Sequence, residues 1–121
     1  MTLLVNGLIA LIALLHVYFL VLEMFLWTKP LGLRTFGQSL EAAKASEVLA
    51  ANQGLYNGFL AAGLAWGLIY PQPIAALHIT TFFLLCVVIA GIYGGVTANR
   101  RILYVQALPA VIALVLLWLV R

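Results

Sequence analysis

Four long apolar stretches constrain this chain more than any other feature. They lie at about residues 3–27, 48–70, 74–97 and 102–120, and each approaches or exceeds the ~20 apolar residues that cross a bilayer. The chain is 66% hydrophobic and 7% charged, whereas about a quarter of a soluble domain is charged. A chain of 121 residues cannot bury this much apolar surface from water. The sequence therefore predicts an all-α membrane protein, a four-transmembrane-helix bundle in a single domain over residues 1–121.

The connections between these stretches differ in length. Pro71-Gln72-Pro73 and residues 98–101 are tight breaks, which predict antiparallel neighbours. The first connection is longer, and Lys29-Pro30 ends the first helix there. Ser39 can cap a following helix, so we expect the second helix to span about 40–70 and to begin outside the membrane.

The basic residues predict the orientation. Five of the six lie in the first and third connections: Lys29, Arg34, Lys44, Arg100 and Arg101. Only Arg121 lies at the opposite side of the predicted topology. Cytoplasmic loops of membrane proteins carry the excess of Lys and Arg. We therefore expect a multi-pass protein of the bacterial inner membrane, with both termini on the outer side.

Polar side chains gather in one half of the predicted bundle. Counted from the cytoplasmic ends of the helices, all of the following lie in the inner half: His16, Glu23, Asn52, Gln53, Tyr56, Asn57, Tyr93 and Gln106. They come from all four helices, while the outer halves of the second and fourth helices are almost purely apolar. This pattern predicts one polar cavity that is open to the cytoplasm.

Glu23 is the most informative of these residues. An ionised carboxylate in hydrocarbon is costly, and an intramembrane carboxylate is a functional hypothesis by default. No Lys or Arg lies inside a predicted membrane helix, so Glu23 must be protonated, hydrated or paired with a polar group. The candidate partners are Gln53, Asn57, His16, Arg100 and Arg101. The amides alone could instead join helices, which is a common use of such residues in membranes.

Small residues and one proline concern helix packing. Three small-xxx-small pairs, Gly54/Gly58, Gly63/Gly67 and Gly91/Gly95, permit close helix contacts inside the bundle or between protomers of a homo-oligomer. Pro109 cannot donate to the carbonyl of Val105 and should kink the fourth helix.

Several classes of site find no support. The single cysteine, Cys86, excludes an internal disulfide and a CxxC motif. His16 and His78 differ in depth by about 12 Å at helical rise, so they are poorly placed to hold one haem in a monomer. We therefore predict no metal, no cofactor and no nucleic-acid partner.

Five stretches are similar to a known family: His16-Val17-Tyr18, residues 22–27, residues 51–60, residues 90–94 and residues 105–109. They resemble the Domain of Unknown Function 1304 family of bacterial membrane proteins. The run Asn52-Gln53-Gly54 is the most specific part, and the resemblance covers nearly the whole chain. It implies a four-helix inner-membrane protein of about this length and implies no activity.

Three functions remain open at this point. The first is binding or transport of a small molecule or cation, with Glu23 as the proton or cation site. The second is a cofactor-independent membrane enzyme of the isomerase or cyclase type, with Glu23 and His16 as acid and base and a lipid-like substrate. The third is a structural or assembly subunit in contact with membrane lipid, in which the polar residues join helices.

Overall fold

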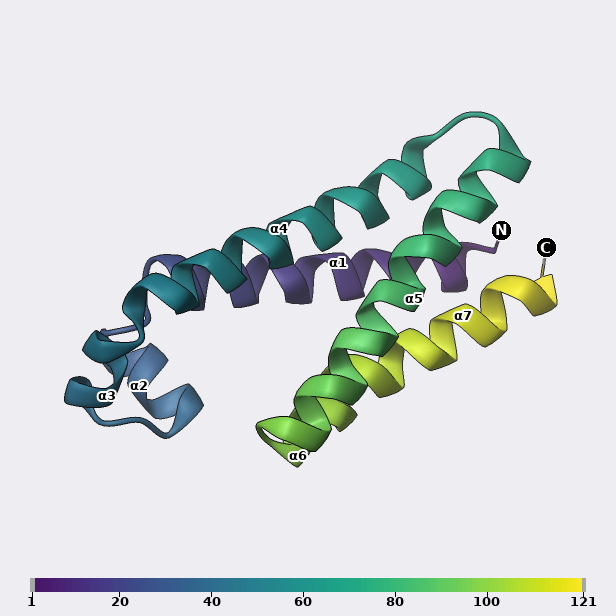
Figure 1. The fold of residues 1–121 in the computed structure, drawn as a ribbon. Coiled ribbons are helices and arrows are strands. Elements are labelled where there is room, and N and C mark those ends of the chain that lie inside the picture. Colours follow the sequence, from purple (N-terminus) through teal and green to yellow (C-terminus); the bar gives the residue numbers. More distant parts are fainter. Residues whose placement is uncertain (1, 121) are drawn as a thin grey trace. The chain divides into compact units, whose positions relative to one another are not determined.

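The computed structural model describes residues 2–120, and all regular structure among them is helical, as predicted. The elements in chain order are α1 (Leu3–Met24), α2 (Pro30–Phe36), α3 (Leu40–Ala45), α4 (Glu47–Ile69), α5 (Pro73–Thr97), α6 (Arg100–Ile102), the π-helical turn η1 (Leu103–Ala107) and α7 (Leu108–Val120), as Figure 1 shows. Within these residues, three helices are long and apolar enough to cross a membrane, namely α1, α5 and the continuous helix over residues 100–120.

The contacts divide the chain into two compact units. One unit contains residues 14–59, and the other contains the residues up to 13 together with those from 60 onward. α1 and α4 each contribute residues to both units.

α2 is a short helix that the sequence reading did not anticipate. Pro30 occupies its first turn, where a missing N–H costs nothing, and Gly37 ends it in the left-handed conformation with φ of 62°. This proline-then-glycine arrangement is the sequence signal that could have predicted it. Gly32 is buried because its backbone lies against the carbonyl of Leu26, where a Cβ would collide.

The predicted helix over residues 40–70 is divided into α3 and α4. Ser39 caps α3 as expected, because its Oγ accepts the Ala42 N–H at 3.1 Å. The division falls at Ser46, whose Oγ donates to the Ala42 carbonyl at 2.9 Å. Such a side-chain bond to the preceding turn competes with the helical backbone pattern.

The unit built from the two ends of the chain has an apolar core. Its fully buried side chains come from α1, α4, α5 and α7: Val5, Ile9, Ile12, Leu64, Leu84, Val87, Ala110, Ala113 and Leu117. α5 and α7 run side by side (Figure 1). Gly91 lies against the backbone of Ala107 in η1, so the predicted close approach at this glycine occurs within the chain.

The π-helical turn ends two residues before Pro109. Leu108 N–H donates to the carbonyl of Leu103, five residues earlier, and Pro109 has no N–H to give. The sequence predicts a kink at this proline, and the structure has a one-turn widening of the helix at this point, which is where π-bulges commonly form.

Candidate functional site

Glu23 and Asn57 meet in the unit of residues 14–59. Asn57 Nδ2 donates to Glu23 Oε1 at 2.5 Å. Glu23 lies in the next-to-last position of α1 and is only 9% exposed, and Asn57 lies in the middle of α4 and is half-buried. Within the unit of residues 14–59, the amide of Asn57, one of the partners that the sequence allows, therefore holds this carboxylate.

Glycines on α4 permit this approach. A Cβ at position 54 would lie 2.6 Å from Met24 Cγ and 3.1 Å from Glu23 Cβ. A Cβ at position 58 would lie 2.8 Å from Leu20 Cδ1. The Gly54/Gly58 pair therefore brings α4 close to the end of α1, as the small-xxx-small spacing predicts.

His16 is the second buried polar side chain of this unit. It is 0% exposed, and its ring meets the Phe19 ring edge-to-face with centroids 5.4 Å apart. His16 and Glu23 are separated by seven residues on α1, which places them on nearly the same face and about 10 Å apart along the axis. A direct contact between the two side chains is therefore not expected, although both are buried.

Three predicted site residues on α4 are exposed in this structure. Asn52, Gln53 and Tyr56 all lie on the outer surface of the helix, and the Tyr56 ring contacts Phe59 with centroids 5.8 Å apart. Gln53 therefore does not join Asn57 as a partner of the Glu23 carboxylate. Asn52 and Asn57, which the sequence treats alike, differ clearly in their surroundings.

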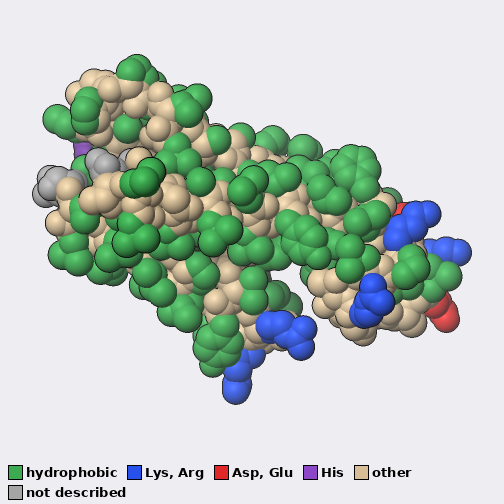
Figure 2. Space-filling model, turned by 180° about the vertical axis from the view of Figure 1, so that it is seen from behind, with side chains coloured by type: hydrophobic (Ala, Val, Ile, Leu, Met, Phe, Trp, Pro, Cys, Tyr) green, Lys and Arg blue, Asp and Glu red, His purple; other side chains and the backbone are tan. Residues whose placement is uncertain are grey.

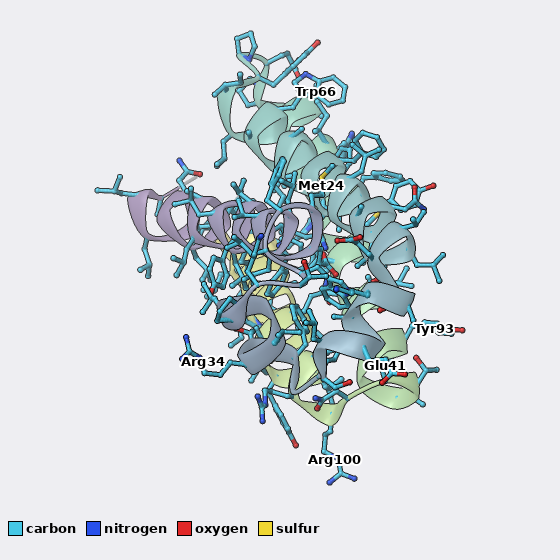
Figure 3. The ribbon with its side chains drawn as sticks, turned by 90° about the vertical axis from the view of Figure 1, so that its left-hand side faces the viewer. Met24, Arg34, Glu41, Trp66, Tyr93 and Arg100 are labelled. Atoms are coloured by element: carbon cyan, nitrogen blue, oxygen red, sulfur yellow. The ribbon has the colours of Figure 1, made fainter. Side chains whose placement is uncertain are left out.

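Tyr93 and Gln106 belong to the other unit. Tyr93 is 71% exposed near the end of α5, and its side chain extends away from the ribbon (Figure 3). Gln106 is partly buried within η1. Whether these two residues share a cavity with Glu23 stays a prediction.

One polar contact near the site was missed by sequence reasoning. Trp27 Nε1 donates to Ser46 Oγ at 3.1 Å, which ties the chain just after α1 to the start of α4. Trp27 is one of three tryptophans in the chain, and the residues around it do not point to Ser46. Its partner is nineteen positions away and has no distinctive pattern around it.

The Glu23–Asn57 pair leaves one carboxylate oxygen for a further contact. One carboxylate oxygen is held by a neutral amide, and within the described residues Oε2 receives no hydrogen bond from another side chain. A carboxylate held in this way can accept a proton or contact a cation through its second oxygen. Neutral Asn57 can accompany either protonation state, because its amide both donates and accepts.

Comparisons with known proteins agree with the sequence resemblance. The model of the family described as "Protein of unknown function (DUF1304)" matches residues 10–118. The uncharacterised protein YpaA of Lactococcus lactis subsp. lactis (strain IL1403) is 32% identical over 117 residues, which cover 95% of this chain and 97% of that protein. No solved structure matches the chain.

Proposed function

Because this chain belongs to the DUF1304 family of proteins of unknown function, its own side chains must indicate its role, and we propose that it binds and transports a small molecule or cation, with Glu23 as the proton or cation site. The observation that carries this proposal is the buried Glu23–Asn57 pair on an apolar, membrane-length helix. The proposed protein crosses the bacterial inner membrane four times, with both termini outside and Glu23 reached from the cytoplasm.

The fourth span is α4. Its 23 residues give a length of about 35 Å at helical rise, which is enough to cross the hydrocarbon core. It is less apolar than the other three helices because it carries Asn52, Gln53 and Asn57. Its hydrogen bond to Glu23 joins it to α1 along the inner part of the predicted span.

The free-energy cost of burying a carboxylate favours a functional role for Glu23. Burying an acidic group in a membrane costs several kcal/mol unless it is paired or neutralised, and one amide is only partial compensation. A site that needed only to join α1 and α4 could use two neutral amides. Glu23 instead supplies a group that changes charge when it takes up a proton or cation.

Proteoliposome flux tests the proposal directly. Purified protein is reconstituted, a gradient of the lipophilic cation tetraphenylphosphonium is imposed, and proton movement is followed with an internal pH dye. We expect cation uptake coupled to proton exit, and we expect Glu23→Gln to reduce it to the level of empty vesicles.

The chain offers matched controls for this experiment. Its other two acidic residues, Glu41 and Glu47, are both exposed, so Glu41→Gln and Glu47→Gln remove the same charge elsewhere. Both variants should retain wild-type flux. Flux that survives in Glu23→Gln, or uptake by the wild type no greater than that of empty vesicles, would contradict the proposal.

A second candidate function is supported by the burial of His16 on the same face of α1. In this alternative, a lipid-like substrate lies between His16 and Glu23, and the two residues act as acid and base. With lipid extracts as substrate, His16→Ala should abolish product formation followed by mass spectrometry. Loss of cation flux in Glu23→Gln together with full flux in His16→Ala would favour transport instead.

A further inference from the structure

The connection between α1 and α4 is a folded surface element. Residues 28–46, which we term the cap, contain α2 and α3 and belong entirely to the unit of residues 14–59. The cap begins four residues after the end of α1, which has the length and hydropathy of a membrane span. Its position in the chain therefore places it at the boundary between hydrocarbon and water.

Three contacts hold the cap against the end of α1. The backbone of Gly32 lies against the Leu26 carbonyl without room for a side chain. The rings of Trp27 and Phe36 meet with centroids 4.8 Å apart. The hydrogen bond from Trp27 to Ser46 links the last residue of the cap to the residue that precedes the cap. The cap is thus held close to the membrane end of α1 rather than extending away as a free loop.

The exposed surface of the cap combines apolar and basic side chains. Leu31 is 38% exposed, Phe36 is 39% exposed and Leu40 is 46% exposed. Lys29, Arg34 and Lys44 are exposed as well. At the right of Figure 2, basic side chains lie near acidic ones, and Figure 3 shows Arg34 extending from the ribbon of α2.

The cap carries a net positive charge. Residues 28–46 carry three basic side chains and one acidic side chain, Glu41, so the formal charge is 3 − 1 = +2. Amphipathic segments with Lys or Arg beside Leu, Phe and Trp lie in the membrane interface, with the apolar groups at the acyl boundary. Basic residues close to the bilayer surface are attracted by anionic headgroups.

We propose that the cap lies in the membrane interface and binds anionic phospholipid headgroups through Lys29, Arg34 and Lys44. Leu31, Phe36 and Leu40 contact the upper acyl chains. A lipid surface fits better than an acidic protein because the exposed apolar and basic groups adjoin a membrane-spanning helix. This role is independent of ion binding at Glu23.

Lipid retention in the whole protein tests the proposal. Protein in detergent is equilibrated with equal amounts of phosphatidylglycerol and phosphatidylcholine, and the bound lipids are measured by native mass spectrometry. We expect phosphatidylglycerol to predominate among the bound lipids. In the triple variant K29Q/R34Q/K44Q, the ratio of bound phosphatidylglycerol to bound phosphatidylcholine should fall about fivefold for each charge removed. The control variant R100Q/R101Q removes two basic residues of the other unit and should lose less of the preference than the triple variant does.

A depth measurement covers the case in which the triple variant does not fold. With Trp66→Phe and Trp118→Phe, Trp27 is the remaining tryptophan, and it reports from the residue next to the cap, where it contacts Phe36 and Ser46. Brominated phosphatidylglycerol in vesicles should quench Trp27 more strongly than brominated phosphatidylcholine at the same mole fraction. Equal quenching by the two lipids overturns the proposal, as does an unchanged lipid preference in a folded triple variant. Binding of a poly-glutamate peptide to the vesicle-embedded cap, with no lipid preference, overturns it in favour of an acidic protein partner.

Discussion

At the scale of single residues, burial separates side chains that look alike in the sequence. Asn52 and Asn57 lie five positions apart on α4. Five residues rotate a helix by about 140°, so the two amides lie on different faces. Asn57 faces Glu23 and donates to it, while Asn52 is exposed. The contribution of each amide to stability therefore depends on which residues its face of α4 contacts.

This difference gives a paired mutational prediction. Asn57→Leu leaves the Glu23 carboxyl without its amide donor and should destabilise the fold by about 1 kcal/mol or more. Asn52→Leu removes the same group from an exposed position and should cost much less. The midpoint of SDS-induced unfolding, followed by circular dichroism, measures both. Equal destabilisation by the two variants would contradict the Glu23–Asn57 contact.

At the scale of helices, glycines set how closely the elements approach. Gly91 on α5 lies against η1, and a Cβ at position 91 would be 2.6 Å from the backbone nitrogen of Ala107 and 2.9 Å from its Cα. Backbone atoms cannot move aside as a flexible side chain can. The neighbouring Gly94 instead faces the side chain of Ile102, at 3.1 Å from its Cγ2.

We therefore expect the two glycines to respond differently to alanine. Gly91→Ala should push α5 away from the π-helical turn and destabilise the fold by about 1–3 kcal/mol. Gly94→Ala should cost less, because the Ile102 side chain can change rotamer. Thermal unfolding of the purified variants in the same detergent compares them, and a larger loss for Gly94→Ala would refute this packing.

At the scale of the whole molecule, the number of spans decides which connections share a side of the membrane. If α4 crosses the bilayer, Lys29 before it and Gln72 after it lie on opposite sides. If α4 does not cross, both residues lie on the same side. The excess of basic residues in the first and third connections predicts that Lys29 and Arg100 both lie in the cytoplasm.

Cysteine labelling in intact cells tests this topology. In a Cys86→Ser background, a membrane-impermeant maleimide should label Gln72→Cys from outside and should leave Lys29→Cys and Arg100→Cys unlabelled. After lysis, all three should react. Outside labelling of Lys29→Cys together with Gln72→Cys would show that α4 does not span and would contradict the four-span proposal.

Much of the architecture follows from the sequence because it depends on local patterns. The all-helical fold, the hydrogen bond to Ser39 that begins α3 and the close approach at the glycine pairs each come from residue types at fixed spacings. The division at Ser46 was not predicted, because serine is common in helices and its effect here depends on bonds to Ala42 and Trp27. The π-helical turn was anticipated only as a kink at Pro109.

The sequence by itself determined that this is a helical protein of the DUF1304 family with segments long and apolar enough to span a membrane, and that a buried Glu23 needs a polar partner, since hydropathy and the cost of a buried carboxylate are properties of the residues. Only the tertiary structure decided which partner that is. Gln53 and Asn57 are both amides within reach of the predicted site, but the rotation of α4 and the space left by Gly54 bring Asn57, rather than Gln53, to the carboxylate. Which side chains meet across two helices depends on the rotation of each helix against its neighbour, which no local pattern in the chain specifies.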